Sequence, residues 1–534
     1  MSCETNLEYF QNALDSKENW ALKMLSSWPK FTSFPVPENL IQFGPFSECQ
    51  NFHHKISLNS SQMLHGQYCL TSYSSMLWHD FDETSIEYIN DTIIEENTII
   101  FKNGICLPAS CTSQQIFDFV KSFLRETNFI VLNMFCQKKE EISFQLIDFA
   151  VLFIISVLII LTLSGTFLNH KVENTNCNKF LQSFSLFSNF KNLISNDNKN
   201  TSIDCLNGLK VISSLWIIIG HRMNMMIEYP NQMKLFMSFE EKIILRIAEM
   251  YTSIVDTFFV VSGILVSIKC MKLFKNQKFN YLNFCFSRFS RFVPPLTIIF
   301  LFFMSTLPKL IINGPQMSEF EEELEDCRES WIKSLFLLGN FSENLCLRHT
   351  WYATVDFQLF IISPAIIYGL FKFGQNFVKM IVVIILLGQI NIFILKFSSN
   401  VEDEQEEDLF YDNTRYRFMP WFIGIMTGYI MQNVETNSNL LRKKFRALSW
   451  VLSCASLIVL EFIRSNQNLS LVIKALYAAS HRVIYSCAIA WIIYACHNLK
   501  SGSFVRIFLS HRYWRPLSKM CLSIYLGKLS ENFI

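Results

Sequence analysis

The sequence has little charge for its 534 residues. Charged residues make up 17% and the formal net charge is +1, so no overall field attracts nucleic acid or an acidic substrate. The first twenty residues, MSCETNLEYFQNALDSKENW, lack the basic and apolar segments of a secretory signal peptide. The acidic runs lack metal-ligand spacing, so we expect no bound metal. The low net charge also leads us to expect no nucleic-acid partner.

Apolar residues are abundant, at 51% of the chain with a mean hydropathy of +0.25. Residues 149–168 contain no charge, and about 20 helical residues cross a hydrocarbon core. We therefore predict a polytopic α-helical membrane protein, in the plasma membrane or an endomembrane, with about nine or ten transmembrane helices surrounded by membrane lipid. The further predicted spans are 209–227, 250–268, 292–312, 350–371, 378–396, 417–433, 447–464 and 475–497.

The loops alternate in charge. Those at 269–291, 434–446 and 498–516 are rich in Lys and Arg, which places them in the cytosol. The loops between them are acidic and hold N-x-S sequons at Asn340 and Asn468, which suits a glycosylated face. By the same count the polar segment 1–145 is extracellular or lumenal.

This N-terminal segment is predicted to be a small, disulfide-rich, mainly α domain. It has sequons at Asn59 and Asn90. Its cysteines in an oxidising compartment indicate disulfides, whereas reduced thiols in a cytosolic domain are the alternative. Export usually needs a signal peptide, so we expect the true N-terminus to be missing, unless the first span is a reverse anchor. The disulfide candidates are Cys3, Cys49, Cys69, Cys106, Cys111 and Cys136, with Cys327 and Cys346 in one outer loop.

Two ionisable residues share a face of the second predicted span. Lys210 precedes His221 by eleven positions, which is about three turns and about 16 Å along a helix. Ionisable groups inside a membrane are costly and often mark a site, so this pair could join a cytosolic entrance to a buried base. Alternatively, Lys210 reaches to the interface and His221 makes a packing contact.

Further charged residues lie in or beside other spans. Arg288 and Arg291 are three apart, and paired guanidinium groups suit phosphates, although positive-inside anchoring also explains them. Asp256 and Asp356 could neutralise a cation or orient the histidine, or could be satisfied structural ions.

Several segments, in order, carry a resemblance to a known family. The chain resembles the membrane acyltransferase-3 family fused to the nose-resistant-to-fluoxetine N-terminal domain. The resemblance implies four parts, which are an N-terminal domain at 1–145, a first transmembrane helix at 146–168, a cytosolic linker at 169–204 and an acyltransferase-like membrane domain at 205–534. The last of these matches the start of a final span whose apolar part is only seven residues, so we expect it to be truncated. The segments are NWALKMLSSWPKF, GPFSEC, HGQYCL, GICLPASC, LNGLKVISSLWIIIGHR, VDTFFVVSGIL, SRFSRFVPPL, HTWYATVDFQLFIISP and RFMPWFIGIMTGYI.

The resemblance also implies an activity. The family's basic residue, ten residues, His motif falls on Lys210 and His221, and its Arg-x-x-Arg motif falls on Arg288 and Arg291. It implies an O-acyltransferase that takes an acyl group from a cytosolic acyl-CoA, such as acetyl-CoA, to a lumenal or extracellular acceptor hydroxyl. The arginines would hold the phosphates, His221 would act as base or acyl carrier, and Asp356 could orient it. The alternatives are lipid or hydrophobic-drug transport without chemistry, and a receptor whose disulfide domain binds a ligand.

Overall fold

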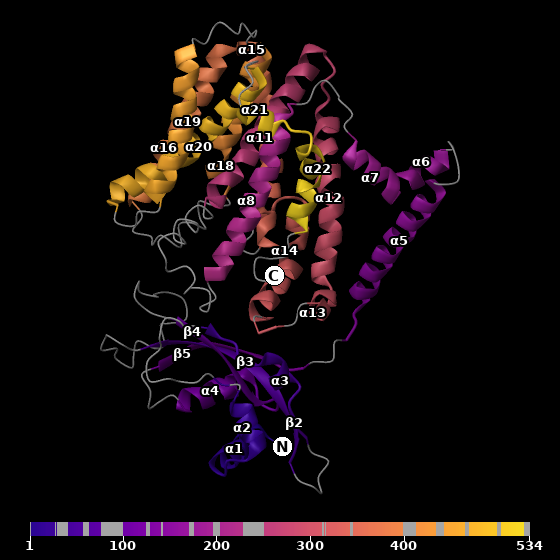
Figure 1. Cartoon of the computed structure of the whole chain (residues 1–534), viewed down its shortest axis with the longest axis vertical. Helices are drawn as coiled ribbons and strands as arrows, with labels where there is room; N and C mark the ends of the chain where they lie inside the picture. The colour runs from indigo at the N-terminus through magenta and orange to yellow at the C-terminus, as the bar shows by residue number, and fades with distance from the viewer. Residues whose placement is uncertain are drawn as a thin grey trace. The chain divides into compact units, whose positions relative to one another are not determined.

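The computed structural model divides the chain into two compact units, which are described separately (Figure 1). The first comprises Met1–Phe144, Met225–Ser238 and Pro308–Glu322, and the second Gln145–Asn224, Phe239–Leu307 and Glu323–Ile534. The residues that the structure describes are 2–26, 28, 41–56, 63–75, 100–123, 129–139, 143–169, 176–195, 203–227, 250–311, 314–315, 317–341, 345–398, 413–433, 443–464, 469–498 and 504–527.

The N-terminal part of the first unit combines a sheet with helices. The long strand β3 pairs antiparallel with β2, β4 and β5, and β1 pairs parallel with β4. The prediction of a mainly α domain is therefore corrected, because strands cover as much of its described length as helices do. Its elements are α1 (Cys3–Asp15), α2 (Asn19–Leu25), β1 (Ile41–Gln42), α3 (Phe46–Gln50), β2 (His53–Lys55), β3 (Met63–Ser75), β4 (Ile100–Pro108), α4 (Ser113–Phe123) and β5 (Phe129–Gln137).

Three disulfides cross-link this domain, which confirms the prediction of disulfide bonds. They are Cys3–Cys111, Cys49–Cys106 and Cys69–Cys136, with sequence separations of 108, 57 and 67 residues. Such long closed loops restrict the unfolded chain, which stabilises a small domain by about 2–5 kcal/mol per bridge. The Tyr68 hydroxyl donates to the Phe43 carbonyl at 2.8 Å, and burial raises the pKa of this phenol.

From residue 145 onward the described chain is helical. The helices are α5 (Leu146–Asn169), α6 (Asn176–Ser183), α7 (Leu186–Ile194), α8 (Cys205–Ile227), α11 (Tyr251–Lys275), α12 (Tyr281–Met304), α13 (Leu307–Ile311), α14 (Met317–Leu335), α15 (Trp351–Phe373), α16 (Gln375–Ser398), α18 (Thr414–Asn433), α19 (Lys443–Arg464), α20 (Leu471–Asn498), α21 (Phe504–Leu509) and α22 (Trp514–Leu526), with single 3₁₀ turns at Gly339–Phe341 and Arg348–Thr350.

Seven helices within the described residues are long and apolar enough to cross a membrane, namely α5, α11, α12, α15, α16, α19 and α20. The other two predicted spans, 209–227 and 417–433, are the helices α8 and α18. Most of α18 is enclosed by protein, so it has less need of an apolar surface than a helix that faces lipid. The polytopic helical architecture is thus confirmed.

One predicted span was misplaced. The span predicted at 292–312 is α12, which begins at Tyr281 and ends at Met304. Arg288 and Arg291 therefore lie inside the helix and not before it. Polar side chains in its first turns concealed the start, because the hydropathy signal rises only after Arg291.

Two central helices, α11 and α18, pack closely at glycines. In the candidate span of α11, 78% of the residues are buried inside the protein, compared with 11% in α5. A Cβ atom on Gly424 would clash with the Val260 backbone, and one on Gly428 with the Ile264 carbonyl. Gly424 and Gly428 are four apart, the small-residue spacing that brings two membrane helices into contact.

Candidate functional site

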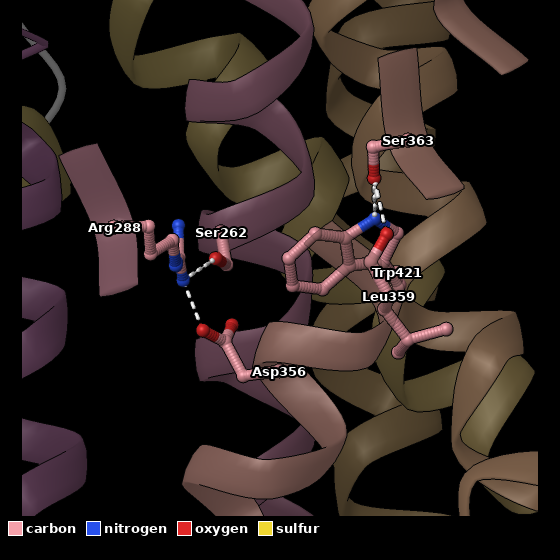
Figure 2. A network of polar contacts seen from close by, with 6 residues as sticks. All are labelled: Ser262, Arg288, Asp356, Leu359, Ser363 and Trp421. Atoms are coloured by element: carbon pink, nitrogen blue, oxygen red, sulfur yellow. Dashed lines mark hydrogen bonds and ion pairs between the residues drawn. The ribbon is translucent and has the colours of Figure 1, made fainter. Parts of the chain in front are cut away.

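A polar contact network joins α11, α12 and α15 (Figure 2). The Nη2 atom of Arg288 on α12 donates to the Ser262 hydroxyl on α11 at 2.8 Å and to the Asp356 carboxylate on α15. The guanidinium also lies over the Phe360 ring, with its Cζ atom 4.6 Å from the ring centroid. Because Asp356 is buried, this ion pair and the ring contact together fix the guanidinium at the junction of three helices.

The buried Trp421 on α18 forms one wall beside this junction. Its Nε1–H donates to the Ser363 hydroxyl at 2.8 Å, and that hydroxyl donates to the Leu359 carbonyl at 2.6 Å (Figure 2). The Cζ atom of Arg288 lies 6.0 Å from the Trp421 ring centroid. The indole is held by a hydrogen bond as well as by packing, which gives the junction a defined shape.

Two more cations accompany Arg288. Lys210 on α8 is half-buried and within electrostatic range of Arg291 and Arg288, whereas Arg291 is exposed. The lysine of one predicted motif and the arginines of the other therefore lie within electrostatic range of one another, without His221. Asp356 pairs with Arg288, so Lys210 and Arg291 add positive charge beside this pair, and an anionic ligand would offset the repulsion among the three cations.

His221 lies at a different level of the bundle. Its ring contacts Tyr251 at the start of α11, with 4.4 Å between ring centroids. Tyr251 and Ser262 are eleven residues apart on α11, as Lys210 and His221 are on α8, and both spacings correspond to about 16 Å on one helix face. Each helix thus has one position near the cations and one near the histidine. We call the position of Lys210 and Ser262 the cation level, and that of His221 and Tyr251 the histidine level.

The geometry separates Asp356 from His221. Asp356 and Ser262 both contact the same guanidinium nitrogen, so the carboxylate lies at the cation level, about 16 Å along α11 from the Tyr251 that touches His221. The expectation that Asp356 orients the histidine is therefore corrected. Sequence could not show this, because α12 and α15 are distant along the chain.

A second buried ion pair was missed as a site feature. The Arg417 Nη1 atom on α18 donates to the Asp256 carboxylate on α11 at 2.8 Å, and their side chains are 1% and 0% exposed. The Arg417 guanidinium also lies over the Trp351 ring, with its Cζ atom 4.9 Å from the centroid. Neutralising a cation was one of the roles considered for Asp256. The cation could have been sought in the segment RFMPWFIGIMTGYI, whose single arginine is Arg417.

The remaining candidates concern covalent modification. The predicted bridge Cys327–Cys346 is present. The Asn340 amide donates to the Thr414 hydroxyl at 2.8 Å and to Gln358 Oε1 at 3.3 Å, so a glycan on this nitrogen would displace its protein partners. The sequons at Asn59, Asn90 and Asn468 lie outside the described residues. Within the described residues, no group of three or more His, Cys, Asp or Glu side chains could hold a metal ion.

Comparison with known proteins places these features in two matched regions. Residues 3–120 match the family model described as nose resistant-to-fluoxetine protein, N-terminal domain, and residues 203–526, which contain both ion pairs and His221, match an acyltransferase domain. The chain is 22% identical to nose resistant to fluoxetine protein 6 of Caenorhabditis elegans, over 96% of this chain and 72% of the relative. It is also 22% identical to O-acetyltransferase OatA of Staphylococcus aureus, over 51% of this chain and 44% of that protein. No solved structure matches.

Proposed function

Because this chain belongs to the acyltransferase family that its residues 203–526 match, we propose that it transfers an acyl group from a cytosolic acyl-CoA to a hydroxyl-bearing acceptor on the other side of the membrane. The proposal specifies the donor, the acceptor side and the base. The observation that carries it is that Lys210 on α8 lies within electrostatic range of Arg288 and Arg291 on α12.

The cation level suits the phosphates of the donor. Arg291 is exposed and Lys210 half-buried, so both can meet a ligand, whereas Arg288 is held by Asp356 and Ser262. Charge-assisted hydrogen bonds to phosphate are about twice as strong as neutral ones. We infer that Arg291 and Lys210 contact the donor directly and that Arg288 shapes the wall behind them.

The histidine level suits the transfer. A neutral His221 ring can accept the proton of an acceptor hydroxyl while the hydroxyl oxygen forms a bond to the thioester carbonyl carbon. The carbon–sulfur bond then breaks, and the departing thiolate takes up a proton. Tyr251 packs against the imidazole and restricts its orientation, which is the role first assigned to Asp356.

The proposed sidedness draws support from cysteine chemistry. The Cys-rich N-terminal domain and the loop with Cys327–Cys346 are predicted on the same side by the charge of the loops, and both contain disulfides. Disulfides persist in oxidising compartments. We therefore assign that side as extracellular or lumenal and the cation level to the cytosolic side.

The test compares two intramembrane histidines in purified full-length protein in nanodiscs supplied with labelled acetyl-CoA. His221→Gln keeps size and polarity but removes the basic nitrogen, so acyl transfer should fall about 100-fold or more. His481→Gln on α20 is the matched control and should retain most of the activity, since the His481 ring bonds to the Tyr477 carbonyl one turn earlier and stacks on the Tyr477 ring, both contacts within α20.

Two results would count against the proposal. Equal activity in wild type and His221→Gln would remove the histidine from the reaction. Uptake of a labelled lipid or hydrophobic drug by both proteins, without acyl transfer by either, would replace the enzyme with a transporter.

A further inference from the structure

The short helix α7 has an exposed apolar stripe. Leu186, Phe187, Phe190 and Ile194 are 59%, 67%, 62% and 51% exposed, and at about 100° per residue they fall within an arc of about 100°. Asn189 and Lys191 flank this arc, Asn192 lies almost opposite its centre, and no side chain of α7 is buried. A stripe of this kind in water would be unfavourable, so it indicates a partner that covers it.

The stripe lies at the end of a membrane span. The Leu186 backbone N–H donates to the Thr166 hydroxyl in the last turns of α5 at 3.0 Å, and a Cβ atom on Gly165 would clash with the Leu181 carbonyl of α6. The α6–α7 hairpin therefore folds back on α5. Phe167, in the same turns of this span, is 62% exposed, which is close to the exposure of Phe187.

Helix α7 is held in place and is not a loose tail. Lys519 on α22 donates through Nζ to the carbonyls of Asn192 and Leu193 at 2.7 and 3.1 Å, which satisfies backbone acceptors at the C-terminal end of α7. At its other end the Ser185 hydroxyl accepts from the Ser188 backbone N–H at 3.3 Å. The stripe is thus presented in a fixed orientation beside α5.

We propose that α6 and α7 form an interfacial anchor that lies in the headgroup layer of the leaflet at the C-terminal end of α5. The four apolar side chains of the stripe enter the acyl-chain boundary, while the exposed Lys179 and Lys191 meet anionic phospholipid headgroups. Direct continuity with a span whose own side chains face lipid favours a bilayer as the occupant over a protein. With the sidedness proposed above, this leaflet is the cytosolic one.

The test places a photo-crosslinking residue on each face of the same helix. Phe190→p-benzoylphenylalanine, in full-length protein reconstituted into phosphatidylcholine vesicles with phosphatidylserine, should give about tenfold or more lipid adduct than Asn192→p-benzoylphenylalanine. The readout is mass spectrometry of the labelled peptide. Phe187→p-benzoylphenylalanine probes the same stripe and replaces the first variant if that one does not assemble.

The charge of the polar face is tested separately. Lys191→Gln, combined with the label at position 190, should lower the preference of the adduct for phosphatidylserine over phosphatidylcholine about fivefold. Equal lipid adducts on both faces of α7 would overturn the anchor. A dimer band formed by the label at position 190 would instead assign the stripe to a second copy of the chain.

Discussion

Two buried ion pairs in the membrane unit use the same side-chain types in different surroundings. Arg417 and Asp256 are almost without exposure, between the closely packed helices α18 and α11. The Arg288 side chain retains 21% exposure and lies with Lys210 and Arg291. The difference teaches that an intramembrane charge is not by itself a functional residue. The closed pair, Arg417–Asp256, holds helices together, whereas the accessible pair, Arg288–Asp356, can meet a ligand.

Breaking the closed pair should have the largest effect. Asp256→Ala removes the carboxylate that pairs with the buried Arg417 guanidinium, which should destabilise the protein by about 3–5 kcal/mol. The measurement is thermal unfolding in detergent with recovery of monodisperse protein. Asp256→Leu together with Arg417→Met is the control and should regain most of the stability, and a double variant as unstable as the single one would contradict the scaffold role.

Breaking the accessible pair should affect binding. Arg288→Ala with Arg291→Ala removes the charge-assisted contact of Arg291 and the wall that Arg288 forms behind it, so the affinity for an acyl-CoA should fall by about 2–4 kcal/mol, or about 30-fold or more. Calorimetric titration of solubilised protein measures this. Arg291→Ala alone should weaken binding with unchanged thermal unfolding, whereas Arg288→Ala should also lower stability because Asp356 loses its partner.

Unchanged affinity in the double variant would make both arginines topological anchors. Equal stability of the two single variants would remove the distinction between a wall residue and a contact residue.

Adding a side chain at the close contact between α11 and α18 should have a smaller effect on stability. Gly424→Ala places a methyl group against the Val260 backbone, and the helices must separate, at about 1–3 kcal/mol. Gly314→Ala is the control, since a Cβ atom there meets nothing within 4 Å. Thermal unfolding of the two variants decides the point, and identical midpoints would show that the close approach carries no stability.

The smallest effect is expected at the hydrogen-bonded sequon. Asn340→Gln should leave the gel mobility unchanged because its amide already serves Thr414 and Gln358. Asn59→Gln with Asn90→Gln should increase mobility, as peptide-N-glycosidase does, if the N-terminal domain is exported. A glycan found on Asn340 by mass spectrometry would show that the hydrogen bonds of this amide to Thr414 and Gln358 break.

The sequence predicted most of the features that depend on a single helix or on the redox state of one compartment. Long apolar runs predicted the spans, cysteine content predicted disulfides, and the spacing of Lys210 and His221 predicted a shared face of α8. What it could not predict depends on contacts between distant segments. The pairing of Asp356 with Arg288 and of Asp256 with Arg417 joins residues 68 and 161 positions apart, and no local pattern specifies either.

The N-terminal sheet escaped prediction for a related reason. Strand β3 pairs with β4 and β5, which follow it at a distance in the chain, and no tight-turn signal joins them. The start of α12 was missed because its first turns carry the two arginines that form part of the candidate site. The charged side chains at the start of α12 thus obscured its hydropathy pattern.

The most direct test of the account uses sealed proteoliposomes of defined orientation and labelled acetyl-CoA, which does not cross the bilayer. Release of free CoA thiol and acyl transfer are expected when the donor is on the face with Lys210 and Arg291, and neither is expected when the donor is on the face with the disulfides. Donor consumption only from the disulfide face would contradict the sidedness. Absence of donor consumption from both faces, by protein whose disulfides and unfolding are normal, would contradict the acyl-CoA-dependent transfer itself.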